Sequence, residues 1–181
     1  KKTNLWVELG LQTADAQSAA FIRRGYPLSV FTQAVYALAE RNIPVVVHII
    51  LGLPGESRET VLRTIDYLNR LPIQGVKLQL LHVLSDSDLA DLYRAGEYTP
   101  LEKEEYLTLV GDCIAHLRAD IVLHRLTGDG DKNTLLAPLW SLRKRDVLNH
   151  LHRYLRENHI RQGMSCKIDL SVIYNKPKDV L

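Results

Sequence analysis

The sequence predicts an α/β fold in which parallel strands alternate with crossover helices. Four apolar runs recur at intervals of roughly 30 to 45 residues, with amphipathic segments between them. The second run, at 44–51, is almost unbroken β-branched and aliphatic sequence, which is typical of a strand covered by helices on both faces or by a ligand on one. It ends in Gly52, Pro54 and Gly55 and leads into a helix. The pattern predicts a parallel sheet or an incomplete barrel, with ligands at the carboxyl ends of the strands.

The first half of the chain holds five expected elements with recognisable boundaries. Gly25 and Pro27 stop the first helix, because both residue types interrupt helices. Ser29 and Ser57 cap the two helices that follow, because a serine hydroxyl accepts a hydrogen bond from the first turn. The expected elements are a strand at 5–12, a helix at 15–24, a helix from Ser29, a strand at 44–51 and a helix at 58–70.

The second half continues the alternation and ends in a basic helix. The expected elements are a strand at 75–83, helices at 86–95 and 102–118, a strand at 121–126 and a last helix at 137–158. Over residues 139–162 there are six Lys or Arg against two acids. The tail at 164–181 holds a strand-like patch, IDLSVIY, for which the sequence indicates no partner.

Composition and charge describe an ordinary soluble protein. The formal net charge is +2 and 24% of the residues are charged, so electrostatics gives no strong case for nucleic acid or a membrane surface. No apolar run approaches the roughly 20 residues that span a bilayer, and the first residues lack the apolar region of a signal peptide. We therefore expect no membrane partner and a cytoplasmic location.

The two cysteines, Cys113 and Cys166, form no CxxC pair, so this chain can build neither a disulfide framework nor a cysteine cluster site. Cys113 stands among aliphatic residues and is expected in the core. The chain enters directly into a strand-like segment, and its sole methionine is Met164. We therefore expect it to be a piece of a longer protein.

Motifs for the commonest chemistries are absent from the sequence. There is no catalytic triad, Walker loop, GxGxxG or paired zinc-ligand motif. His150, His152 and His159 are expected at the surface of the last helix, and the loop at 128–131 lacks the later acidic ligands of a calcium site. His124 and Arg125 remain open for a function.

Polar residues at the strand ends are the remaining candidates for a site. Glu8, Gln12 and His48 would meet at one edge of a parallel sheet. Each also has a structural interpretation: Glu8 paired with an arginine, Gln12 in a loop, His48 as a hydrogen-bonded core imidazole. Arg23 and Arg24 are expected at the solvated end of a helix, pointing about 100° apart, unless an anion is bound there.

Three sequence blocks resemble the second half of the radical S-adenosylmethionine (SAM) domain in order and spacing. They are VELGLQT at 7–13, RRGY at 23–26 and VHIILGLPGES at 47–57. The similar branch contains the catalytic subunit of Elongator and oxygen-independent coproporphyrinogen oxidase. The later segments YRAGEYTPLEKEEY, HRLTGDG and APLWSLRKRDVLNHL resemble YhcC-type radical SAM proteins, so the resemblance extends to Gly163.

The resemblance implies a fold and a division of the chain. Residues 1–126 would form the second half of a partial (β/α)6 TIM-like barrel, and 127–163 a C-terminal helical extension, with 164–181 as a tail of unknown structure. Relatives hold a [4Fe-4S] cluster through a CxxxCxxC loop, which this chain lacks. The cluster ligands would therefore lie in an upstream half, and this fragment alone would be inactive.

The resemblance also implies a cofactor site for SAM. Gln12 matches a polar residue near the ribose, Arg24 the arginine that meets the methionine carboxylate, and His48 a ribose-side position. The adenine surface would be Ile50, Leu51, Gly52 and Leu53. With Glu8 on the same strand as Gln12, these are the predicted cofactor-binding residues.

Two hypotheses about function follow. The first is the C-terminal part of a radical SAM iron–sulfur enzyme, acting on an unknown substrate that could be tRNA and supplied by an electron donor. The second is a non-redox α/β module that binds a nucleotide or RNA through the strand-end groups and the basic last helix. In either case the isolated fragment is expected to have an open sheet edge through which it self-associates.

Overall fold

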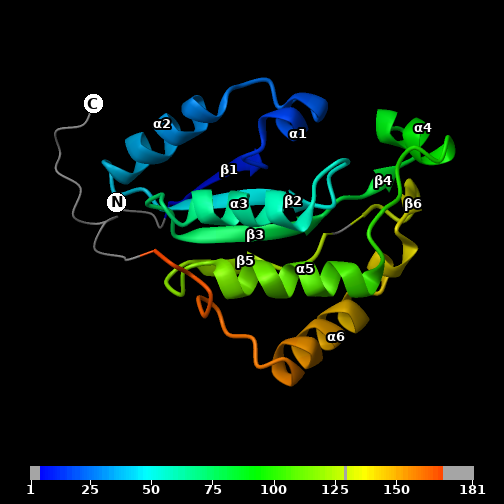
Figure 1. The fold of residues 1–181 in the computed structure, drawn as a ribbon. Coiled ribbons are helices and arrows are strands. Elements are labelled where there is room, and N and C mark those ends of the chain that lie inside the picture. Colours follow the sequence, from blue (N-terminus) through cyan, green and yellow to red (C-terminus); the bar gives the residue numbers. More distant parts are fainter. Residues whose placement is uncertain (1–4, 129, 169–181) are drawn as a thin grey trace.

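A parallel four-stranded sheet forms the centre of the molecule (Figure 1). The computed structural model describes residues 5–128 and 130–168. The strand order is β1-β2-β3-β5, and every neighbouring pair is parallel. The strands are β1 (Val7–Gln12), β2 (Val45–Leu51), β3 (Gly75–Leu80) and β5 (Val122–Arg125). The predicted α/β class with parallel strands and crossover helices is confirmed.

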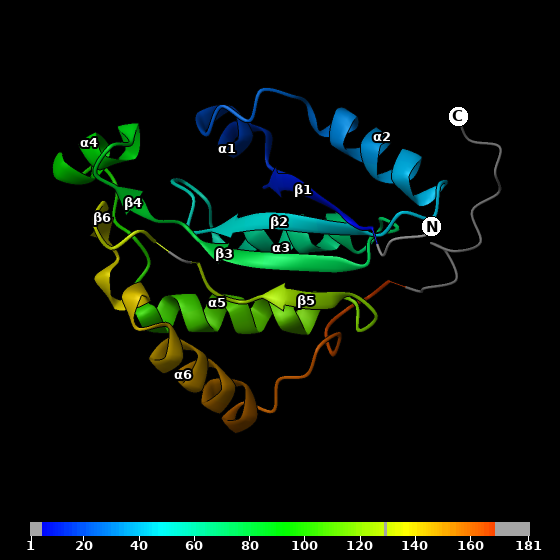
Figure 2. The same ribbon diagram turned by 180° about the vertical axis from the view of Figure 1, so that it is seen from behind.

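Helices connect these strands and cover one face of the sheet. They are α1 (Ala16–Phe21), α2 (Leu28–Ala39), α3 (Arg58–Leu68) and α5 (Lys103–His116). In Figure 1, α3 lies in front of β2 and β3. Figure 2 shows the molecule from behind, and there β2 and β3 lie in front of α3. Asp15 caps α1 by accepting from the Ser18 N–H, and Ser57 caps α3 by accepting from the Thr60 N–H.

The core lies between the sheet and these helices, and strand alternation builds it. Alternate side chains of β2 and β3 point into it and are almost fully buried: Val45, Val47, Ile49, Leu51, Val76, Leu78 and Leu80. They meet Val61, Ile65 and Leu68 of α3 and Val110, Cys113 and Ile114 of α5. The core position predicted for Cys113 is therefore confirmed.

A smaller unit stands beyond the carboxyl ends of the strands. It contains β4 (Val83–Leu84), α4 (Asp88–Arg94), β6 (Leu135–Ala137) and the 3₁₀ helix η1 (Leu139–Leu142). β4 and β6 pair antiparallel. The last helix, α6 (Lys144–Glu157), packs against α5 and adds Val147 and Leu151 to the core. The predicted division of the chain at residue 126 stays a prediction.

Several predicted boundaries are wrong. The strand expected at 75–83 is two strands, because Val83 and Leu84 leave the sheet to pair with β6. The last helix begins at Lys144, since residues 135–137 are a strand and residues 139–142 form the 3₁₀ helix η1.

The end of the first helix also differs from the prediction. α1 stops at Phe21, so neither Arg23 nor Arg24 is helical, and Arg23 has a φ of +53°. α2 begins at Leu28 with Pro27 at its N-cap, before the expected Ser29.

Most of the IDLSVIY patch lies outside the described residues. No helix of the described residues has the length and apolar character needed to cross a membrane.

Candidate functional site

The sheet face opposite α3 and α5 carries polar side chains from all four strands; we call it the polar face. Gly75 shows which side chains share this face, because a Cβ at Gly75 would lie 2.6 Å from the His124 ring and 3.1 Å from Val46. A Cβ at Gly10 would likewise lie 2.6 Å from the Gln12 amide nitrogen. By strand alternation the face holds Glu8, Gly10 and Gln12 of β1, Val46, His48 and Ile50 of β2, Gly75, Lys77 and Gln79 of β3, and His124 of β5.

Glu8 is the centre of a hydrogen-bond network on the polar face. Its Oε2 accepts from Lys77 Nζ at 2.6 Å and lies 2.7 Å from His48 Nε2. The other nitrogen of the same imidazole, Nδ1, lies 3.0 Å from Gln79 Nε2. The side chains are partly exposed, at 37% for Glu8, 24% for His48 and 16% for Lys77. Three neighbouring strands therefore contribute to one connected group.

The network lowers the pKa of Glu8 to about 2. The largest cause is the hydrogen bond from Lys77, followed by those from Trp6 and His48. Glu8 is therefore ionised at neutral pH. The sequence interpretation that paired Glu8 with an arginine is wrong, because its cationic partner is Lys77 on β3, which the parallel register brings within reach.

Arg24 lies at the carboxyl end of β1 and is tied to the backbone there. Its Nη1 donates to the carbonyls of Leu11 at 3.2 Å and Thr13 at 2.7 Å, and its Nε donates to the Tyr26 carbonyl at 3.2 Å. The guanidinium carbon stands 5.2 Å from the centre of the Tyr26 ring, whose hydroxyl donates to the Gly10 carbonyl. The described residues give Nη2 of Arg24 no hydrogen-bond partner.

Arg23 has a different role from Arg24. Its Nη2 lies 2.5 Å from Oδ2 of Asp88 at the start of α4. Both side chains of this ion pair are well exposed. Arg23 was expected at a solvated helix end; it is solvated, but it lies in the loop after α1 and pairs with the first residue of α4.

The turn after β2 divides the predicted adenine surface. Ile50 is partly exposed on the polar face, whereas Leu51 is buried in the helix-side core and offers a ligand only its backbone. Gly52 has a φ of +91°, and its carbonyl accepts from the Tyr98 hydroxyl at 2.8 Å. Leu53 lines a cavity of about 500 Å³ at the carboxyl edge, together with Ile22, Leu81, His82, Leu89 and other residues.

A second polar cluster fastens the turn after β2 to the loop after β1. The buried Thr13 hydroxyl donates to Glu56 Oε1 at 2.5 Å, and the Thr64 hydroxyl accepts from the Ala14 N–H at 3.0 Å. Burial raises the pKa of Glu56, against the opposing effect of its hydrogen bond with Thr13. The cluster joins the turn after β2 to the loop whose Thr13 carbonyl accepts from Arg24.

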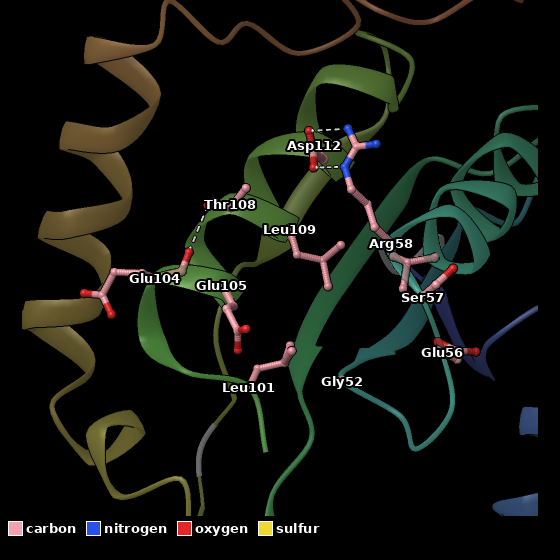
Figure 3. A pocket seen from close by; sticks show the side chains of 11 residues that line it. Gly52, Glu56, Ser57, Arg58, Leu101, Glu104, Glu105, Thr108, Leu109 and Asp112 are labelled. Atoms are coloured by element: carbon pink, nitrogen blue, oxygen red, sulfur yellow. Dashed lines mark hydrogen bonds and ion pairs between the residues drawn. The ribbon is translucent and has the colours of Figure 1, made fainter. Parts of the chain in front are cut away.

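A cavity of about 450 Å³ lies on the helix side of the sheet (Figure 3). The Arg58–Asp112 ion pair bridges α3 and α5 at its wall, with Nε to Oδ2 at 2.5 Å and Nη2 to Oδ1 at 2.9 Å. Of the predicted cofactor-binding residues only Gly52 borders it. The predicted site therefore does not lie in this cavity.

The structure adds site residues that the sequence interpretation missed. Lys77 and Gln79 stand two apart in the partly alternating segment GVKLQL, and this period-two signal points both to one face. His124, left open above, lies on the polar face against Gly75. Thr13 and Glu56 gave no comparable signal, because their contact joins two loops far apart in the sequence.

The described residues contain no group of three or more His, Cys, Asp or Glu side chains that could hold a metal ion. Cys113 is fully buried, which raises the pKa of its thiol, and Cys166 lies apart at 3.6 Å from Asn69 Nδ2. His152 and His159 are exposed, as expected, whereas His150 is partly buried beside Lys103 and Asp146.

Two family models match this chain along most of its length. Residues 1–68 match the radical SAM superfamily, and residues 73–157 match the radical SAM C-terminal domain. Both matched ranges agree with the extent of the resemblance in the sequence.

Relatives of known sequence cover nearly the whole chain. The "Uncharacterized protein YtqA" of Bacillus subtilis is 34% identical over 163 residues, or 90% of this chain and 51% of the relative. "Protein YhcC" of Escherichia coli is 33% identical, over 86% of this chain and 50% of its own. A "tRNA uridine(34) acetyltransferase" of Methanocaldococcus jannaschii is 26% identical over 58% of this chain and 20% of its own. The chain thus spans about half the length of the first two.

A solved structure shares the fold. The archaeal Elp3 of Methanocaldococcus infernus, with an N-terminal deletion, superposes with a TM-score of 0.75 at 18% identity. The superposition covers 87% of this chain and 37% of that one. At this identity the likeness concerns the fold, and it agrees with half of a partial TIM-like barrel.

Proposed function

Because the chain belongs to the radical SAM superfamily, we propose that the full-length protein is a radical SAM enzyme and that this chain forms one wall of its cofactor site. The observation that carries the proposal is the joint placement of three kinds of group at one edge of the sheet. A guanidinium, neutral polar side chains and an apolar strand end with a glycine turn lie together there. These are the groups that a carboxylate, a ribose and an adenine require.

The residues fit SAM but not an iron–sulfur cluster. One buried and one distant cysteine cannot supply three thiolates, so the cluster ligands of the whole enzyme would come from sequence outside this chain. With both groups bound, reductive cleavage of SAM would supply a radical that takes a hydrogen atom from a substrate. This chain's own residues would bind and orient SAM.

Each predicted residue receives a role in the proposal. Arg24 would meet the methionine carboxylate through Nη2, while Nη1 and Nε hold its guanidinium on the backbone. Gln12, Glu8 and His48 would face the ribose. Adenine would lie against Ile50, Gly52 and Leu53, with Leu51 contributing only backbone.

The proposal is tested by SAM affinity in the anaerobically reconstituted full-length protein. Arg24→Ala removes a charge-assisted pair in a partly buried place, which costs about 2–5 kcal/mol, or roughly 30-fold or more in affinity. Arg23→Ala should leave the affinity almost unchanged, because Arg23 pairs with Asp88. Tyr26→Phe removes the tie to the Gly10 carbonyl without changing charge, and so controls for loss of the local backbone geometry.

Equal losses for the two arginine variants would contradict the assignment of Arg24. A loss at Tyr26→Phe as large as that at Arg24→Ala would mean that Arg24 is needed for the shape of the loop and not for the ligand.

We also propose that this chain by itself is inactive and binds no cluster. Iron and sulfide reconstitution of the isolated chain should leave it colourless. A stoichiometric [4Fe-4S] spectrum that survives replacement of both Cys113 and Cys166 would contradict this. The free edge of β1 would pair with an upstream strand in the full-length protein, and the isolated chain would self-associate there.

A role for tRNA as substrate is a second candidate, favoured by the basic face of α6. Arg145, Arg153 and Arg156 are exposed along this helix, and one group of relatives bears the name tRNA uridine(34) acetyltransferase. Replacing these three by Glu should weaken tRNA binding and reduce its salt dependence. Unchanged salt dependence would count against a tRNA contact on α6.

A further inference from the structure

His48 on the polar face has both ring nitrogens engaged. Nε2 lies 2.7 Å from Glu8 Oε2 and Nδ1 lies 3.0 Å from Gln79 Nε2. Each imidazole nitrogen makes one hydrogen bond in the ring plane, as donor or acceptor. His48 therefore has no hydrogen bond left to offer to a ligand, although the resemblance matched it to a ribose-side position.

The direction of these bonds is set by the groups on either side. Ionised Glu8 is only an acceptor, so Nε2 of His48 must carry the proton that lies between them. The amide nitrogen of Gln79 is only a donor, so Nδ1 of His48 accepts from it and carries no proton. The hydrogen bonds are thus donated from Gln79 to His48 and from His48 to Glu8. Lys77 also donates to Glu8 and balances its negative charge.

This arrangement turns the amide oxygen of Gln79 away from the network. The described residues give Oε1 of Gln79 no hydrogen-bond partner, and its side chain is partly exposed on the polar face. Gln79 pairs in register with Ile50, the apolar residue of the polar face nearest the Gly52 turn. An acceptor with no partner among the described residues therefore lies next to the surface proposed for adenine.

The charge of the network suits a neutral partner. Glu8 and Lys77 form an ion pair at 2.6 Å, and the neutral ring of His48 adds no net charge. The amide oxygen of Gln79 therefore matches a hydroxyl donor better than a phosphate or a carboxylate, because either anion would need a positive charge beside it.

We propose that Gln79 accepts a hydrogen bond from a sugar hydroxyl of the bound nucleoside, and that His48 is a positioning residue that holds Gln79 and Glu8. The inference rests on the function proposed above and deepens it. Gln79 thereby takes the ligand contact that the resemblance assigned to His48.

Binding to matched ligands tests the contact in the reconstituted full-length protein. Gln79→Ala should weaken SAM binding about 3- to 10-fold, the usual range for one neutral hydrogen bond. The loss should disappear for either the 2′-deoxy or the 3′-deoxy analogue of SAM, whichever lacks the contacting hydroxyl. Gln33→Ala, at an exposed glutamine on α2, is the matched control and should change neither affinity.

A double variant separates positioning from direct contact. If His48 acts through Gln79, then adding His48→Phe to Gln79→Ala should lose no more affinity than Gln79→Ala alone. Additive losses, or an equal loss at Gln79→Ala for SAM and both deoxy analogues, would overturn the inference.

The tautomer of His48 gives a readout that needs no ligand. With ¹⁵N-labelled histidine in the full-length protein, and the H48F variant to assign the signal, the ring should show a protonated Nε2 and an unprotonated Nδ1. Gln79→Glu places a carboxylate at Nδ1 and should convert the ring to the doubly protonated form. A wild-type ring with the proton on Nδ1 alone would overturn the inference.

The outcomes separate the two proposals. Wild-type protein that binds no SAM, or that binds it equally well after Arg24→Ala, would defeat the proposed cofactor site and the inference with it. SAM binding that depends on Arg24 but shows no coupling to Gln79 would defeat the inference alone.

Discussion

The two faces of β2 and β3 differ sharply, although alternate residues of the same two strands form them. The helix-side face carries Val47, Ile49 and Leu78 and is closed to solvent. The polar face carries His48 and Lys77, which both contact Glu8, and Gln79, which bonds to His48. One face is therefore held by apolar packing and the other by a partly exposed network. We therefore expect the stability of the fold to depend mainly on the first face.

The sharpest test of this comparison substitutes neighbouring residues of β3. Leu78→Ala empties a fully buried site and should lower the free energy of unfolding by about 2–5 kcal/mol. Gln79→Ala, one position later on the opposite face, should cost less than about 1 kcal/mol. Urea denaturation of the full-length protein measures both. Similar losses at the two positions would show that the polar face is part of the structural core.

Two carboxylates should give opposite pH dependences of stability. The pKa of Glu8 is lowered from its ordinary 4.5 to about 2, so its stabilising contribution is present above pH 4.5 and is lost as the pH falls towards 2. The pKa of Glu56 is raised by burial, so its contribution is present at pH below the ordinary value and is lost as the pH rises through the raised value.

Thermal melts against pH distinguish the two carboxylates. Glu8→Gln should destabilise the protein at pH 7 by less than about 1 kcal/mol, because Glu8 is more than a third exposed and solvent screens the pair. Glu56→Gln should remove the loss of stability at higher pH. If both variants changed the pH profile in the same direction, the opposite environments assigned to the two carboxylates would be wrong.

The smallest effect is expected at the rim of the carboxyl edge. Arg23→Ala breaks an ion pair whose two side chains are both exposed, and it should cost less than about 0.5 kcal/mol, a cost that added salt removes. Lys77→Met breaks the less exposed pair with Glu8 and should cost more and depend less on salt. Melting curves at low and high salt compare the two pairs, and equal salt sensitivity would contradict their different burial.

Particular residues show where prediction from the sequence succeeded. The apolar run at 44–51 and the glycine turn after it predicted β2 and the helix that follows, because strand and helix periods are local properties. Glu8 and His48 stood out as polar residues inside apolar runs, and the structure brings them within 2.7 Å. Their roles in cofactor binding stay predictions.

Other features depended on contacts between distant segments. The strand at 75–83 was predicted as one element, but Val83 and Leu84 pair with Ala137 and Leu135 of a strand that the sequence did not predict. Arg23 and Arg24 continued a helical pattern, yet Asp88 and the carbonyls of Leu11 and Thr13 hold them in other directions. Local propensity could not indicate these partners.

By itself the sequence determined the α/β alternation and the family, since both depend on residue type and on spacing along the chain. Only the tertiary structure decided that Lys77 is the cation beside Glu8 and that Gln79 engages the second nitrogen of His48. The reason is the parallel register: it places residues 31 and 69 positions apart in the chain within hydrogen-bond distance, and no local pattern encodes that register.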